Sequence, residues 1–232
     1  LVEKYDLLAV PVADAAGRLL GIVTADDILK VVKAEASEDV FALTAPLGEE
    51  PLVAGAFSWR AAWRRTFWLV VNFATALLAA VVIRAFTPVI ETFLVLVFFM
   101  PVVMGTAGNV GTQSLAVAVR RFATDRQWQP QVRRALRWEL ATGLRLGAAC
   151  GTLLGLVVLV WWGDPRLAAV LWLAIVASLT ISAAGGLLIP LVLQRLRVDP
   201  AVASGPLVTT ITDLASVTIY FTLALLLLRG GP

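Results

Sequence analysis

The chain has 232 residues, of which 59% are hydrophobic and 15% are charged, whereas a soluble domain is about 45–50% apolar. Its mean hydropathy of +0.87 places most of the chain in lipid. The net charge is +3, but the basic residues stand at the ends of apolar runs, which indicates membrane topology rather than nucleic-acid binding. Without histidine and with the single cysteine Cys150, histidine-based zinc or triad chemistry and an internal disulfide are excluded, so no enzyme is expected.

The N-terminal stretch predicts a strand, a second strand and a helix. Two β-type runs, Leu8 to Val12 and Leu19 to Val23, flank a turn. Thr24 then opens a helix, because Thr24 and Asp27 have the spacing of a capping box. The run GIVTADD at residues 21–27 resembles the second half of a CBS domain. That resemblance makes Thr24 and Asp27 candidate contacts for ATP, and helix capping alone is the alternative.

Three acids, Glu35, Glu38 and Asp39, follow on this helix, three and four residues apart and therefore on one face. Such acids repel one another unless a cation joins them, and a solvated helix end is the alternative. Prolines and glycines between residues 45 and 58 then break the helix. We expect a partial CBS segment over residues 1–44, a linker over 45–58 and a membrane domain over 59–232.

The membrane piece predicts an all-α polytopic protein with five transmembrane helices, preceded by the partial α/β segment and a connecting helix. The expected spans are residues 66–86, 92–119, 138–162, 167–194 and 205–228. Arginine-rich stretches at residues 60–65, 120–137 and 195–197 all fall on one side. The positive-inside rule therefore predicts a multi-pass protein of the cell membrane, with a cytoplasmic N-terminus and the C-terminus outside.

Glycines shape the expected helices of the third and fourth spans. Gly147, Gly151 and Gly155 recur every four residues, and small residues at that spacing allow close helix packing in membranes. The pair Gly185 and Gly186, followed by a proline at position 190, is expected to break the fourth span.

One acid, Asp213, lies within the fifth span. A carboxylate in hydrocarbon costs roughly 2.5 to 3.5 kcal/mol, so it should face a partner or water. Upstream, Pro200, Gly205 and Pro206 are expected to delay regular helix, as irregular backbone does where it lines a cavity. Neighbouring threonines add oxygens, namely Thr209, Thr210 and Thr212. These features predict an ion site, with an interfacial cap or ion pair as the alternative.

The second span carries another group of small and polar residues. Gly108 and Thr112 are four residues apart and share a face, and Gly105 extends that stripe. Helix packing explains the glycines well, but it does not explain the amides of Asn109 and Gln113.

Two runs, GNVGTQ at residues 108–113 and DPAVASGPLVTTITD at 199–213, resemble the MgtE family of magnesium channels or transporters. With the CBS-like segment before five spans, the resemblance covers essentially the whole chain. It implies a homodimer in the lipid membrane, with a Mg²⁺ pore between two membrane domains. It also implies a pore site and a regulatory site. The pore residues would be Asp213, Thr209, Gly105, Gly108, Asn109 and Thr112, and the regulatory Mg²⁺ ligands Glu35, Glu38 and Asp39.

Magnesium suits these residues because it keeps several waters and binds through one or two carboxylates, and a symmetric dimer would supply two copies of Asp213. The expected function is a Mg²⁺-selective, Mg²⁺-gated channel that admits Mg²⁺ to the cytoplasm. One alternative is a cation-coupled secondary transporter of divalent metals. Another is a CBS-regulated anion channel, although an anion path would want arginines where this chain has an acid.

Overall fold

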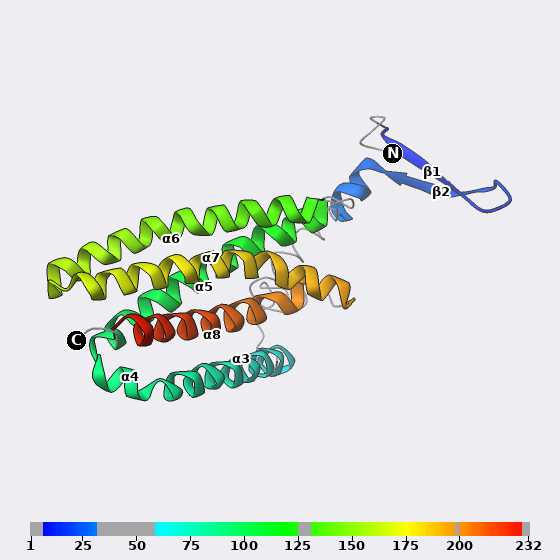
Figure 1. The fold of residues 1–232 in the computed structure, drawn as a ribbon. Coiled ribbons are helices and arrows are strands. Elements are labelled where there is room, and N and C mark those ends of the chain that lie inside the picture. The colour runs from blue at the N-terminus through cyan, green and yellow to red at the C-terminus, as the bar shows by residue number, and fades with distance from the viewer. Residues whose placement is uncertain (1–6, 32–58, 125–130, 198–199, 229–232) are drawn as a thin grey trace. The chain divides into compact units, whose positions relative to one another are not determined.

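The computed structural model describes residues 7–31, 59–124, 131–197 and 200–228. The chain divides into two compact units, Leu1–Gly55 and Ala56–Pro232, which Figure 1 draws in blue and in cyan to red. The acidic group formed by Glu35, Glu38 and Asp39 lies outside the described residues, and so does the predicted linker after it. The regulatory role of these acids stays a prediction.

The N-terminal unit contains a β-hairpin followed by a helical turn. Strand β1 (Ala9–Ala13) pairs antiparallel with strand β2 (Leu19–Thr24), and residues 25–31 are helical. The register is irregular between Val12 and Ala13, where the first strand enters its turn. This arrangement confirms the predicted strand, strand and helix.

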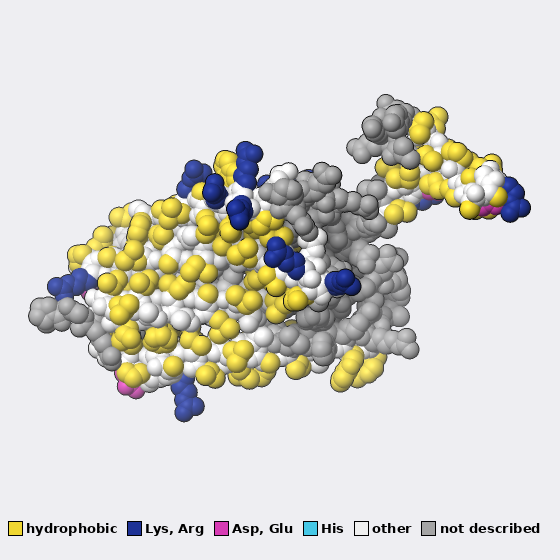
Figure 2. All heavy atoms as spheres, turned by 45° about the vertical axis from the view of Figure 1, so that its right-hand side comes forward, with side chains coloured by type: hydrophobic (Ala, Val, Ile, Leu, Met, Phe, Trp, Pro, Cys, Tyr) yellow, Lys and Arg dark blue, Asp and Glu magenta, His cyan; other side chains and the backbone are white. Residues whose placement is uncertain are grey.

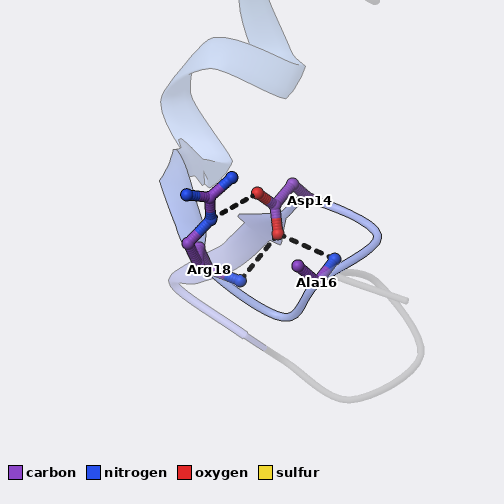
Figure 3. A network of polar contacts seen from close by, with 3 residues as sticks. All are labelled: Asp14, Ala16 and Arg18. Atoms are coloured by element: carbon purple, nitrogen blue, oxygen red, sulfur yellow. Dashed lines mark hydrogen bonds and ion pairs between the residues drawn. The ribbon is translucent and has the colours of Figure 1, made fainter.

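Asp14 organises the hairpin turn through both carboxylate oxygens (Figure 3). Its Oδ1 accepts the backbone N–H groups of Ala16 at 2.9 Å and of Arg18 at 2.8 Å, while Oδ2 accepts Nε of Arg18 at 2.9 Å. The bond from the Arg18 backbone is the main reason that the pKa of Asp14 lies below its ordinary value. Gly17 completes the turn with a φ of +80°, a conformation that glycine adopts without strain.

Six helices form the described part of the membrane unit. They are α3 (Trp59–Ala85), α4 (Thr87–Thr92), α5 (Val95–Thr124), α6 (Val132–Trp162), α7 (Pro165–Arg195) and α8 (Pro200–Leu228). Figure 1 shows the long helices side by side, running back and forth. Helix α7 is the central one, because it packs against α5, α6 and α8, while α3 packs mainly against α8.

Helices α5 to α8 contain the four segments of the described chain that are long and apolar enough to cross a membrane. Helix α3 has 27 residues, and within its described side chains the apolar stretch covers Asn72–Ala85, which is shorter than a span. The polytopic helical membrane fold is therefore confirmed, and a membrane crossing by α3 remains a prediction.

Two predicted interruptions are absent from these helices. Helix α7 runs through Gly185, Gly186 and Pro190, and α8 begins at Pro200 and continues through Pro206. The expectation of irregular backbone at both places was wrong. Helix persists because lipid offers no hydrogen-bond partners to a broken backbone, and neighbouring helices compensate for a proline. Proline also fits the first turn of a helix, where its missing N–H would have no partner.

The predicted close packing of the third span is confirmed against α7. A Cβ atom added at Gly147 would lie 2.7 Å from Cα of Val176, and one at Gly151 would lie 3.1 Å from Cδ1 of Trp172. Gly155 is looser, with its nearest neighbour at 3.9 Å. The backbone of α6 thus rests almost directly on α7, as glycines in membrane helices allow.

Arginines gather at one end of the membrane unit. The last turns of α5 and α7 carry Arg121 and Arg195, and the first turns of α6 carry Arg133 and Arg134. Because successive long helices run in opposite directions, these termini meet at the same end (Figure 1). In Figure 2 most dark blue side chains of this unit lie from its upper middle toward its right-hand side, while others lie at the left and at the bottom.

Candidate metal centre

The Asp213 carboxylate lies where α8 packs against α5, and it is half-buried. A Cβ atom built on Gly108 of α5 would lie 3.7 Å from Oδ1 of Asp213. Because Gly108 has no side chain, α5 leaves this oxygen uncovered. The two residues that the sequence placed in different spans therefore meet at one point in the bundle.

Glycines bring α5 close enough for this meeting. A Cβ atom at Gly111 would lie 3.0 Å from Cγ2 of Thr212 and 3.1 Å from Cγ1 of Val208, both on α8. On the other side, a Cβ atom at Gly186 of α7 would overlap the carbonyl oxygen of Gly111 and lie 2.7 Å from Cβ of Ser114. At Gly111, one turn from Gly108, helix α5 is thus in close contact with both α7 and α8.

The threonines before Asp213 mostly bond within their own helix. The Thr209 hydroxyl donates to the Gly205 carbonyl at 3.3 Å, and the Thr212 hydroxyl donates to the Thr209 carbonyl at 3.0 Å. Thr212 is buried and its Cγ2 faces Gly111, so a role for its oxygen beside the acid stays a prediction.

The two amides of α5, Asn109 and Gln113, lie on its outer side. Gly105, Asn109 and Gln113 recur every four residues and are exposed, whereas Thr112 is half-buried. The Thr112 hydroxyl donates to the Asn109 carbonyl at 2.9 Å, and the position of a Cβ atom at Gly105 is open. The structure therefore places Gly108 at the carboxylate and leaves Gly105 and Asn109 on the outer face of α5.

Within the described residues, no three His, Cys, Asp or Glu side chains come together to form a metal cluster. The structure places one carboxylate, that of Asp213, at this point, facing Gly108. Hard oxygen ligands with few charges suit a cation that keeps part of its hydration shell.

The family model of MgtE, described as a divalent cation transporter, matches residues 100–223. This match runs from α5 into α8 and includes both Gly108 and Asp213. The chain belongs to the MgtE family. The resemblance seen in the sequence is thereby confirmed.

Three curated relatives of this MgtE-family chain are named magnesium transporter MgtE. The protein of Bacillus subtilis is 38% identical over 224 residues, which cover 97% of this chain and 49% of that protein. That of Enterococcus faecalis is 39% identical over 232 residues, covering 98% and 50%. That of Thermus thermophilus is 38% identical over 236 residues, covering 99% and 51%. The chain spans about half the length of these relatives.

A second carboxylate contact in this MgtE-family chain escaped the sequence reasoning. The Ser114 hydroxyl of α5 donates to Oε2 of Glu139 on α6 at 2.8 Å. Ser114 is buried and Glu139 half-buried. The sequence does show an acid within an apolar helix, which signals a polar partner, but no spacing rule pairs it with a serine on another helix.

In the N-terminal unit, Thr24 and Asp27 form the capping box that their spacing predicts. Oδ2 of Asp27 accepts the Thr24 hydroxyl at 2.6 Å and its backbone N–H at 3.2 Å, and the Asp27 N–H donates to the Thr24 hydroxyl at 3.4 Å. The bond from the Thr24 hydroxyl is the main reason that the pKa of Asp27 lies below its ordinary value. The described contacts account for capping, and the ATP contact stays a prediction.

Proposed function

We propose that this MgtE-family chain is the membrane part of a magnesium channel, in which Mg²⁺ passes the Asp213 carboxylate on its way into the cytoplasm. The main support is the half-buried Asp213, whose Oδ1 faces the missing side chain of Gly108. The names of the relatives supply the ion, since all three are called magnesium transporters.

The outer face of α5 supports a pore between two copies of the chain. Exposed amides at Asn109 and Gln113 would be unfavourable against lipid, so they should face water or a partner. A two-fold dimer would place two Asp213 carboxylates around one axis. One or two carboxylates with retained water is the usual coordination of Mg²⁺ in proteins.

The deciding experiment measures Mg²⁺ flux into liposomes that contain the purified chain and a Mg²⁺-sensitive dye. Asp213→Ala should abolish flux while the protein still inserts and dimerises, because it removes the carboxylate. Asp213→Asn should reduce Mg²⁺ affinity, since oxygen remains without charge. Glu91→Gln is the matched control, because Glu91 is an exposed acid at the end of α4. Wild-type flux in Asp213→Ala would show that Mg²⁺ does not depend on the Asp213 carboxylate for its passage, and the proposal would be wrong.

Electrical recording of the same liposomes tests the channel mechanism against coupled transport. A channel gives unitary currents that follow the Mg²⁺ gradient alone. Flux that needs a gradient of a second cation, without unitary currents, would instead show a secondary transporter.

We also propose that the arginine-rich end of the membrane unit is cytoplasmic, following the positive-inside rule. The test uses a cysteine placed at Gln127 in a Cys150→Ala background. An impermeant thiol reagent added to intact cells should leave that cysteine unlabelled, and labelling would reverse the orientation.

A further inference from the structure

Arg145 is an exposed arginine well inside the apolar helix α6. A span needs about twenty residues, and counting that number back from Trp161 near the other end of α6 places the membrane boundary close to Ala141. Arg145 then lies about 6 Å, or one helical turn, inside the hydrocarbon. A charge at that depth must reach a polar group.

The side chain of Arg145 faces away from the helical bundle. Gly143 and Gly147 are buried against α7, and a residue two positions from each is turned about 200° around the helix. Side chains on a helix tilt toward its N-terminus. The Arg145 guanidinium is therefore directed back toward the arginine-rich start of α6, as a snorkelling arginine would be.

Three more residues share this outer surface of α6. Arg134 and Trp138 precede Arg145 by eleven and seven residues, close to three and two full turns, and Arg137 borders them. All four side chains are exposed, and Trp138 is exposed by 59%. We call Arg134, Arg137, Trp138 and Arg145 the α6 arginine face. Tryptophan at this depth is typical of the headgroup level.

No acidic side chain in the described part of the chain pairs with the charge of Arg145. Arg145 has no ion pair or hydrogen bond to any residue that the structure describes. The membrane unit has four described acids, and each lies elsewhere: Glu139 bonds Ser114, Asp164 caps α7, Asp213 faces Gly108, and Glu91 ends α4. Within the described part of the membrane unit, a second copy of the chain would offer only the same four acids, so charge complementarity there favours a lipid over a protein partner.

We propose that the α6 arginine face binds the phosphate headgroup of an anionic phospholipid in the leaflet at the arginine-rich end of the bundle. The arginines supply charge and paired N–H donors to the phosphate. Trp138 lies beside the glycerol level, and the apolar surface of α6 lies along the acyl chains. With the orientation proposed above, this is the cytoplasmic leaflet, where anionic lipids attract basic residues.

The test is native mass spectrometry of the purified full chain with equimolar phosphatidylglycerol and phosphatidylcholine, which gives the ratio of the two bound lipids. Arg145→Gln should lower the phosphatidylglycerol preference about fivefold, which is about 1 kcal/mol at 1.4 kcal/mol per tenfold. Arg145→Lys should keep most of the preference. Arg166→Gln is the matched control, because it removes an exposed arginine near the start of α7, at the opposite end of the bundle.

The double variant Arg134→Gln/Arg137→Gln leaves Arg145 in place, so it gives an independent reading of the same preference and should lower it too. An unchanged lipid ratio in both variants would overturn the proposal. A loss of dimer in Arg145→Gln at an unchanged lipid ratio would show that the face holds a second copy. Added inorganic phosphate should not displace phosphatidylglycerol, and displacement would show a site for free anions instead.

Discussion

The hydroxyl of Ser114 and the carboxylate of Glu139 join α5 to α6 through a hydrogen bond of 2.8 Å. These two helices otherwise pack mainly on α7. The bond satisfies an acid inside the membrane unit, and it lies one turn along α5 from Gly111, the glycine that sets the approach of α5 to α8. The hydrogen bond to Glu139 therefore helps to fix the position of α5, the helix that carries Gly108.

We expect Ser114→Ala and Glu139→Ala to show a coupling of about 0.6 kcal/mol and at most about 1.7 kcal/mol, the range for hydrogen bonds between membrane helices. The measurement is a double-mutant cycle on unfolding in mixed micelles with sodium dodecyl sulfate. A cycle of Ser114 with Glu91, which lies at the other end of the bundle, is the control and should show no coupling. Equal couplings in the two cycles would mean that the bond adds nothing to stability.

Gly186→Ala should destabilise the membrane unit by about 1–3 kcal/mol, the usual cost of overpacking. The new methyl group would meet the Gly111 carbonyl, Cβ of Ser114 at 2.7 Å and the Leu115 nitrogen at 2.9 Å. Gly155→Ala is the matched control, because its nearest neighbour would be at an ordinary 3.9 Å. The same unfolding assay compares the two, and an equally small effect of both substitutions would show that α5 can move away from α7.

The Thr24 and Asp27 capping box makes the N-terminal unit sensitive to acid. Its bonds place the pKa of Asp27 below its ordinary value of 3.8. The stabilisation is therefore complete above pH 3.8 and is lost as the pH falls through the lower, folded value. Thr24→Val should raise the Asp27 pKa toward 3.8, as measured by NMR titration of the carboxyl carbon in the full chain. The pKa of Asp14, which Arg18 lowers, should stay unchanged, and an unmoved Asp27 would contradict the assignment.

The acids before the membrane unit lead to a hypothesis on gating, motivated by the common helical face that their spacing predicts. A shared Mg²⁺ would draw Glu35, Glu38 and Asp39 together and close the pore. A thousandfold preference for the closed state is worth roughly 4 kcal/mol. In a full-length parent, neutralising all three should keep flux intact but remove its inhibition by internal Mg²⁺. Neutralising Glu49 and Glu50 is the control. Inhibition at the wild-type Mg²⁺ concentration would leave the three acids as a solvated helix end.

Several features of this protein could be predicted from the sequence because they depend on residues close together in the chain. Apolar length predicted the membrane helices, and the spacing of Thr24 and Asp27 predicted their capping box. An isolated acid in an apolar run identified Asp213, since the cost of a charge in lipid does not depend on which helix lies beside it. The glycine spacing in α6 likewise predicted one close-packed face.

The tertiary structure decided which helices meet and which way their side chains turn. Residues near Gly186 and Pro206 looked like breaks, but the helices persist, because neighbouring helices and the lack of competing water favour intact backbone bonds. Only packing turns Thr212 inward and places Ser114 against Glu139. Local spacing determines the face that a residue occupies on its own helix, whereas the partner of that face depends on contacts between segments far apart in the sequence.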